Sequence, residues 1–324
     1  MKLKITIALS LLFHLNSKAQ DPRITQYESI PLLISPANTG NFEGDLRATS
    51  SFSRLSANNL HNYFTNIGLE YKIGDSKSTA IGISYSRSGS NEFSMSGDYF
   101  GLSASTFFHL DENKKSMLRL GIQASYISGS YQVSKDKYNN WLDVNSFIYT
   151  NNTNPTQDIL KNNYLNFALG FGYKYENDNI RFESNLGAYN VLNPKYDINK
   201  ENETKLRIRY SFSNSFRYAF NQLNAIKFSQ TSWQEGLYLN QSPNPTNLPL
   251  DSLRISESIF GLNWERSGKT PYSLGVYSRS FKSASLIAGV SFSKNLTARI
   301  SYELPLNEKY YNVSQFGISL IAIK

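Results

Sequence analysis

The sequence contains no cysteine and few charged residues. Among its 324 residues, Asp, Glu, Lys and Arg together make up only 18%, whereas aromatic residues reach 14%. The missing cysteines exclude a disulfide framework. The charged fraction lies below the roughly 25% that is usual for soluble domains. We infer that something other than water covers part of the protein surface.

Long hydrophobic runs are also missing, because no stretch approaches the ~20 apolar residues that a membrane-spanning helix needs. The apolar run from Ile5 to Leu15 follows two lysines and is followed by Ser17 and Ala19. This order is typical of a secretory signal peptide, and we expect residues 1–19 to be cleaved after Ala19. If the protein enters a membrane, it does so without helices.

The net charge points to a partner class. The formal charge is +8, and removal of residues 1–19 leaves +5, from 30 basic and 25 acidic residues. Because a signal peptide directs the chain away from nucleic acid, we expect attraction to anionic lipid or to an acidic partner.

From Asp45 onward the chain alternates between apolar and polar residues with a period of two, which predicts β-strands. In the run 63–73, Tyr, Thr, Ile and Leu side chains share one face. Such runs are about ten residues long, as a tilted membrane strand requires. The pattern predicts an all-β fold of about fourteen strands, near 45–55, 62–73, 79–87, 98–109, 116–128, 164–175, 180–189, 205–217, 223–232, 255–266, 272–279, 284–292, 295–303 and 313–323.

The connections between these strands alternate in length. Short turns follow every second strand, whereas long connections, such as 129–163 and 233–254, follow most of the others. Short turns at one end and long loops at the other are typical of an up-and-down outer-membrane β-barrel, with the short turns in the periplasm. We therefore expect residues 45–324 to form a barrel, with twelve or sixteen strands as alternatives. A secreted soluble β-sandwich is the competing interpretation.

Catalytic and metal-binding patterns are weak. After signal removal only His61 and His109 are left, and neither has a metal-ligand spacing. We expect no cofactor, no metal site and no enzymatic activity. A barrel hydrolase that uses His109 with one of the many serines is a third, weaker hypothesis.

The segment from Gln26 to Gly40, QYESIPLLISPANTG, is unlike the rest of the chain. Pro31 and Pro36 bracket the apolar run Leu-Leu-Ile and prevent a regular strand, and Pro36 disfavours a helical conformation at Ser35. We expect residues 20–44 to pack at the periplasmic mouth or inside the barrel, because the apolar run needs cover.

The stretch QDPRITQYESIPLLISPANTG, residues 20–40, resembles the N-terminal signature of the PorP/SprF family, which belongs to the type IX secretion and gliding systems of Bacteroidetes. Thr25, Ile30 and Ser35 depart from that signature. The stretch LGAYNVLNP resembles a mid-chain family segment, with Asn190 or a neighbour where His is common, and the last hairpin is similar to the family's closing hairpin. The residues that match are Asp21, Pro22, Tyr27, Pro31, Leu32, Pro36, Ala37, Gly40 and Pro194.

The resemblance implies a barrel in the outer membrane of a Gram-negative bacterium that assists type IX secretion or gliding motility. Its implied partners are outer-membrane lipid and either secretion components or the C-terminal domain of a secreted adhesin, which it would anchor at the cell surface. The barrel pattern alone leaves a passive porin-like channel as the alternative. Side chains expected to occlude such a lumen are Phe64, Glu70, Lys72, Arg207, Arg209 and Arg299.

Overall fold

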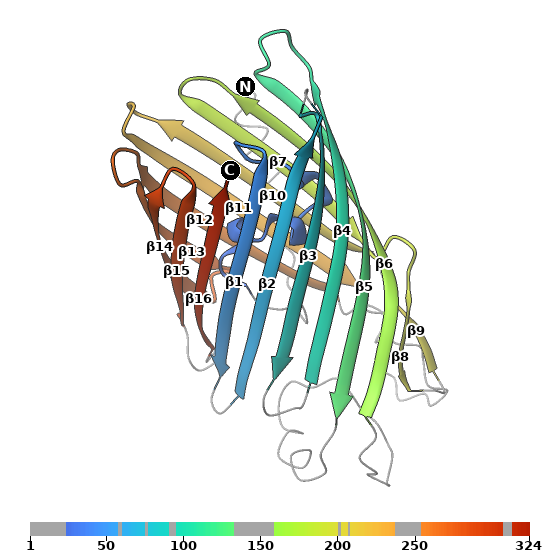
Figure 1. Ribbon diagram of the computed structural model, residues 1–324. Coiled ribbons are helices and arrows are strands. Elements are labelled where there is room, and N and C mark those ends of the chain that lie inside the picture. The colour runs from blue at the N-terminus through green and yellow to red at the C-terminus, as the bar shows by residue number, and fades with distance from the viewer. Residues whose placement is uncertain are drawn as a thin grey trace.

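Fourteen strands of the chain close into an antiparallel barrel (Figure 1). The computed structural model describes residues 24–57, 60–74, 77–90, 95–132, 159–199, 202–206, 208–236, 254–306 and 313–324. Each barrel strand pairs with its neighbours in sequence, and β1 pairs with β16 to close the sheet. The barrel strands are β1 Leu46–Ala57, β2 Leu60–Ile73, β3 Thr79–Ser90, β4 Met95–His109, β5 Ser116–Gln132, β6 Ile159–Glu176, β7 Ile180–Tyr189, β10 Arg209–Ala219, β11 Asn224–Gly236, β12 Arg254–Arg266, β13 Tyr272–Arg279, β14 Ser283–Ser293, β15 Leu296–Pro305 and β16 Ser314–Ile323.

The two ends of the barrel differ. One end, called the short-turn end below, carries brief connections such as 110–115, 177–179 and 267–271. The C-terminus lies at this end, where the backbone N–H of Asp45 donates to the Lys324 carbonyl at 2.6 Å. At the opposite end, called the long-loop end, β5 ends at Gln132 and β6 begins at Ile159, and β11 ends at Gly236 and β12 begins at Arg254. The fourteen-strand, all-β prediction is confirmed.

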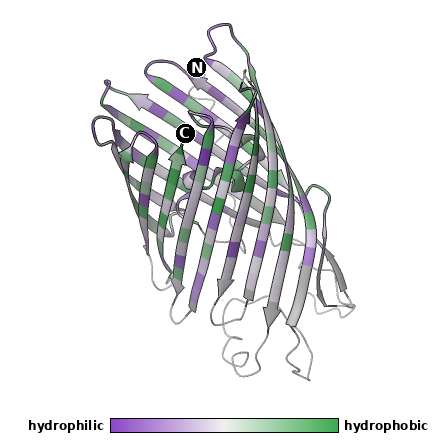
Figure 2. Ribbon diagram, viewed as in Figure 1, coloured by the Kyte–Doolittle hydropathy of each residue, from purple (hydrophilic) through white to green (hydrophobic). Residues whose placement is uncertain are grey.

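Side chains alternate between the outer face and the lumen. On β2, Ile67, Leu69 and Tyr71 are exposed on the outside, whereas Asn66 and Glu70 are buried inside. Figure 2 shows the resulting alternation of apolar and polar residues along the strands. An apolar exterior on a sheet without free edges is what a bilayer requires, because lipid cannot satisfy backbone hydrogen bonds. Within the described ranges, no helix has the length and apolar character needed to cross a membrane.

The hairpin formed by β7 and β10 bends where it leaves the barrel sheet. Asn190 and Asn193 have positive φ angles of 59° and 46°, in the left-handed region that Asn tolerates better than most residues. Beyond the bend the two arms of the hairpin continue as a separate two-stranded sheet, formed by β8 Lys195–Asn199 and β9 Asn202–Lys205. The strand predicted over 205–217 therefore spans the end of β9 and most of β10.

Residues 24–44 are called the inner segment below: residues 24–40 lie buried or half-buried inside the barrel, and residues 41–44 lead out to β1 at the short-turn end (Figure 1). The segment forms three single 3₁₀ turns, at Tyr27–Ser29, Pro31–Leu33 and Pro36–Asn38. Proline occupies the first position of the second and third turns, where its missing N–H has no partner to lose. Ser35 is extended, as its position before Pro36 predicts, and its side chain accepts a hydrogen bond from the Ala37 N–H.

Candidate functional site

The inner segment rests on a row of glycines in the barrel wall. Gly121 of β5 pairs with Gly170 of β6, which pairs with Gly187 of β7. A Cβ atom at these three positions would lie 2.3, 2.5 and 2.4 Å from inner-segment backbone atoms. Such distances are too short for carbon contacts, so only glycine lets the segment approach this closely.

Two serines extend this row on either side. Ser105 pairs with Gly121, and Ser211 pairs with Gly187. The Ser105 hydroxyl donates to the Thr39 carbonyl at 2.6 Å, and the Ser211 hydroxyl donates to the Ile34 carbonyl. The inner segment does not pair with a strand, so its backbone has no β-sheet hydrogen bonds. These serine hydroxyls therefore satisfy carbonyls that would otherwise be buried without a partner.

A buried ion pair holds the C-terminal part of the inner segment. Arg47 of β1 donates to both carboxylate oxygens of Glu70 at 2.8 Å, a bidentate arrangement. Glu70 also accepts the Gly40 N–H at 2.9 Å, and Arg47 donates to the carbonyls of Asn38 and Asn41. The pair therefore binds the segment backbone through both of its members.

A second buried pair holds the start of the segment. Arg279 of β13 and Glu303 of β15 lie 3.1 Å apart, and Arg279 also pairs with Glu257 at 2.6 Å. Arg279 donates to the Ile24 carbonyl at 2.9 Å, and Glu303 accepts the Thr25 hydroxyl at 2.7 Å. Both ends of the inner segment are thus tied to charged lumen residues.

Glu28 forms the third electrostatic contact, in the middle of the lumen. Its carboxylate lies 2.8 Å from the Lys227 ammonium and 3.3 Å from the Arg299 guanidinium. Burial raises the pKa of Glu28, but the two cations outweigh burial and hold the pKa at about 2. Glu28 is therefore ionised at neutral pH and joins β11 and β15 through the segment.

Apolar contacts complete the packing. Tyr27 lies against Trp233 with ring centroids 4.5 Å apart, and burial raises the pKa of the Tyr27 phenol. Ile30 and Ile34 pack into the same buried cluster, as does Phe64. The apolar part of the segment is thus covered by the lumen wall, although most lumen side chains are polar.

The structure places most of the predicted signature residues in this buried segment. Tyr27, Leu32 and Gly40 are buried, as are Pro36 and Ala37, and Pro31 is half-buried. Pro194 lies apart from them, at the bend before β8, where its carbonyl accepts the Leu206 N–H at 2.9 Å. Asp21 and Pro22 lie outside the described residues.

Sequence reasoning identified some lumen residues but not their partners. Glu70 and Arg299 were expected to occlude the lumen by packing and ion pairing, and they form ion pairs with Arg47 and Glu28. Lys72 donates to the Phe42 carbonyl, and Arg207 lies outside the described residues. Four charged partners on the strands were not predicted, although they face the lumen in the alternating pattern; they are Arg47, Glu257, Arg279 and Glu303. Glu28 was not predicted either, and no alternation marks it, because it lies in a 3₁₀ turn of the inner segment.

The two histidines lie apart. The His61 Nδ1 atom lies 3.2 Å from the Ser56 hydroxyl, near the long-loop end, whereas His109 ends β4 at the short-turn end. No group of three or more His, Cys, Asp or Glu side chains in the described part of the chain could hold a metal ion.

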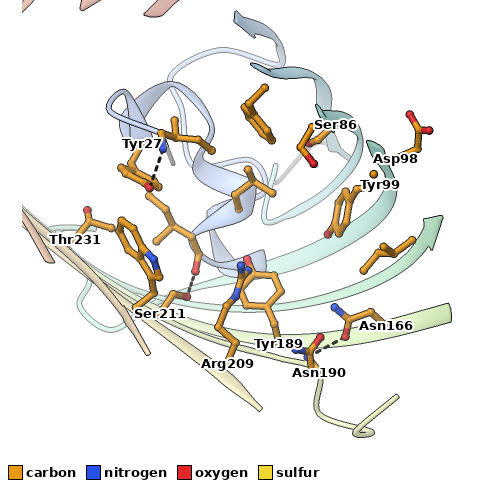
Figure 3. Close-up of a pocket in the computed structure, with 18 of the residues that line it drawn as sticks. Tyr27, Ser86, Asp98, Tyr99, Asn166, Tyr189, Asn190, Arg209, Ser211 and Thr231 are labelled. Atoms are coloured by element: carbon orange, nitrogen blue, oxygen red, sulfur yellow. Dashed lines mark hydrogen bonds between the residues drawn. The ribbon is translucent and has the colours of Figure 1, made fainter. Parts of the chain in front are cut away.

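Two cavities flank the inner segment. The long-loop cavity has a volume of about 210 Å³ and is lined by the inner segment and by residues of eight strands (Figure 3). The short-turn cavity has a volume of about 460 Å³ and is lined by Phe42, Glu43 and the neighbouring wall. Its cationic lining side chains are Lys72, Lys77, Lys114, Lys174 and Arg181, whereas its carboxylates are Glu43 and Glu183.

The chain matches a known protein family. The sequence profile described as "Type IX secretion system membrane protein PorP/SprF" matches residues 16–321, nearly the whole chain. A search of curated proteins finds no significant match.

Solved structures of similar fold are outer-membrane barrels. The CymD monoaromatic hydrocarbon channel is 11% identical, with a TM-score of 0.53 over 91% of this chain and 93% of that chain. A Pseudomonas aeruginosa FadL homologue is 10% identical, with a TM-score of 0.51 over 89% and 92%. At these identities the likeness shows the fold alone.

Proposed function

Because the chain belongs to the PorP/SprF family of type IX secretion system membrane proteins, we propose that it is a closed, non-enzymatic docking barrel of that system. In this proposal the barrel binds secretion components at its short-turn mouth and anchors a secreted surface protein at its long-loop end. It works as a rigid mount in the outer membrane and not as a conduit.

The observation that carries this proposal is the inner segment. Three charged contacts, at Glu70, Glu303 and Glu28, tie it to β1, β2, β11, β13 and β15. A conduit would need a continuous wet lumen, whereas here backbone and apolar side chains fill the middle of the barrel. The passive-channel alternative is therefore disfavoured, and both mouths become the surfaces available for function.

Each mouth offers a distinct surface. The short-turn cavity carries five cations against two carboxylates in its lining. Three of these cations, Lys77, Lys174 and Arg181, also pair with Asp45 or Glu176. Lys72 and Lys114 are therefore the cations best suited to meet an acidic segment of a periplasmic partner. At the long-loop end, Phe281 has a positive φ of 57° and is 72% exposed, stacked near Phe260. An aromatic residue held in a strained turn and facing outward is suited to anchor a surface partner.

Photocrosslinking in living cells tests the proposal. A photoreactive residue at Lys114, which lines the short-turn cavity, should crosslink to a type IX secretion component. The same residue at Phe281 should crosslink to a secreted surface protein. Lys269 is the matched control, because it is also on a short turn but does not line that cavity.

Strong crosslinks from Lys114 and Phe281, with none from Lys269, would support docking at both mouths. Crosslinks from Lys114 alone would restrict the role to the secretion machinery. If neither position yields a secretion component or a secreted surface protein, the docking function is wrong.

A further inference from the structure

The lipid-facing wall of the barrel carries a group of polar side chains on the neighbouring strands β7, β10, β11 and β12. Each of these side chains belongs to an asparagine, a glutamine or a serine, so the group has no charge. Strand register places them side by side across the four strands. They are called the outer polar strip below, and they are Ser184, Asn214, Gln230, Ser232 and Ser258.

Alternation along the strands fixes the outward direction of the strip. On β11, Thr231 lines the long-loop cavity inside the barrel. Its neighbours Gln230 and Ser232 therefore lie on the opposite, outer face, because successive side chains of a strand alternate. On β10, the Ser211 hydroxyl binds the inner segment in the lumen, and Asn214, three positions further along, faces outward.

The strip lies within the apolar band of the wall. Phe228 and Leu262, which are nearer the short-turn end, are exposed on the outside. Tyr210, nearer the long-loop end, is also exposed, and aromatic girdles mark the two bilayer interfaces of such barrels. Elsewhere in the band, apolar side chains such as Ile83 and Ile122 occupy the lipid-facing positions. Polar groups at this depth are costly because lipid offers them no hydrogen bonds.

The strip satisfies only part of its own hydrogen-bonding capacity. The hydroxyl oxygens of Ser232 and Ser258 lie 2.9 Å apart, and the Gln230 Nε2 atom donates to the Ser232 hydroxyl at 3.5 Å. The half-buried Asn214 side chain has no hydrogen-bond partner among the residues that the structure describes. An amide has two N–H donors and an oxygen with two lone pairs. Asn214 therefore presents unmet donors and acceptors on the lipid-facing wall.

A second copy of this chain is the partner that fits such a surface. Barrels of this kind enter the outer membrane in one direction, with their short turns in the periplasm. A two-fold axis that relates two copies must then run along the bilayer normal, so each depth of one wall meets the same depth of the other. The strip faces the strip, and it is complementary to itself because amides and hydroxyls both donate and accept hydrogen bonds.

We propose that the outer polar strip is the contact surface of a homodimer, in which two barrels lie side by side in the outer membrane. The Asn214 amide of each copy forms hydrogen bonds with the strip of the other, and the small serine side chains let the two walls approach closely, as small residues do in membrane helix pairs. The dimer goes beyond the docking function and does not depend on it, because the contact lies on the outer wall and leaves both mouths open to partners.

Disulfide crosslinking in the native outer membrane tests the dimer. The chain contains no cysteine, so any disulfide of a single-cysteine variant is intermolecular. A cysteine replaces each strip residue except Asn214 in turn, because a disulfide requires Cα atoms within about 7 Å and so marks the residues nearest the axis. Two full-length copies with different epitope tags are co-expressed and oxidised with copper phenanthroline. A disulfide-linked band that carries both tags identifies a second copy.

The matched control is Ser50→Cys. Ser50 is an exposed serine on the outer face of β1, and it lies between Ile67 of β2 and Leu320 of β16, which are both exposed and apolar. It has the same chemistry and the same bilayer surroundings as the strip serines, but it lies outside the strip. The heat-dependent electrophoretic mobility of every variant shows whether its barrel is folded.

We expect at least one strip position to give the doubly tagged band, at a yield severalfold above that of Ser50→Cys. Adding Asn214→Leu to that variant should lower the yield severalfold while the barrel stays folded, because the amide is lost at the contact. Adding Asn214→Gln keeps an amide and should preserve most of the yield. Yields at or below the Ser50→Cys control at every strip position, or disulfides only to a different protein, would overturn the proposal.

Discussion

Arg279 and Glu303 face each other inside the barrel with both side chains 1% exposed, and together they hold the first residues of the inner segment. We expect Glu303→Gln to lower the free energy of unfolding by about 3 kcal/mol, because it leaves a buried guanidinium with one fewer carboxylate. Urea titration of the barrel in liposomes measures this change.

The matched control for that substitution is Glu265→Gln. Glu265 pairs with Arg217 at 2.7 Å, but both side chains are more than a quarter exposed. Its loss should cost less than about 1 kcal/mol. Equal effects of the two substitutions would show that burial does not set the strength of these pairs.

The Glu28 contact predicts a pH dependence. The pKa of Glu28 is about 2 in the folded protein, below its ordinary value of 4.5. A lowered carboxyl pKa stabilises the folded state fully above the ordinary value, and this contribution is lost as pH falls toward the folded pKa. Between about pH 4.5 and 2 the wild-type protein should therefore lose stability more steeply than Glu28→Gln. Parallel denaturation curves across that range would contradict the prediction.

The glycine row predicts a steric effect. A Cβ at Gly121 would lie 2.3 Å from the Pro36 carbonyl carbon, a backbone atom that cannot rotate away. Gly121→Ala should therefore destabilise the protein by about 1–3 kcal/mol, as overpacking does. At Gly97 the nearest atom is the Ser88 hydroxyl at 3.3 Å, so Gly97→Ala should have a much smaller effect in the same urea titration.

The occupied lumen predicts electrical silence. In planar bilayers the wild-type barrel should show no steady conductance, because the inner segment fills the middle of the lumen. A variant that lacks residues 24–40 should give discrete steps, provided that its heat-dependent electrophoretic mobility shows a folded barrel. Steady conductance steps from the wild-type barrel would favour the passive-channel alternative over the closed docking barrel.

Alternation in the sequence predicted the barrel strands well because each strand has one lipid-facing and one lumen-facing side. Ile67 and Leu69, assigned to the apolar face, are both exposed on the outside. The prediction was less accurate at β10, because its start is fixed by the bend at Asn190 and Asn193 and not by a change in hydropathy. The hairpin of β8 and β9 within the expected loop was missed for the same reason.

The inner segment shows where sequence reasoning ends. Its prolines excluded a strand, and its apolar run required cover, but two locations satisfied both conditions. Only the assembled barrel brings Glu70, Glu303 and the row at Gly121 and Gly170 to one surface, from strands far apart in the chain.

The sequence by itself therefore determined the all-β architecture, the lipid-facing side of each strand and the family signature, because these depend on local periodicity and nearby residues. The tertiary structure decided that the inner segment fills the lumen and which ion pairs hold it. Those features depend on barrel closure and strand register, which join residues such as Thr25 and Glu303 across 278 positions of sequence.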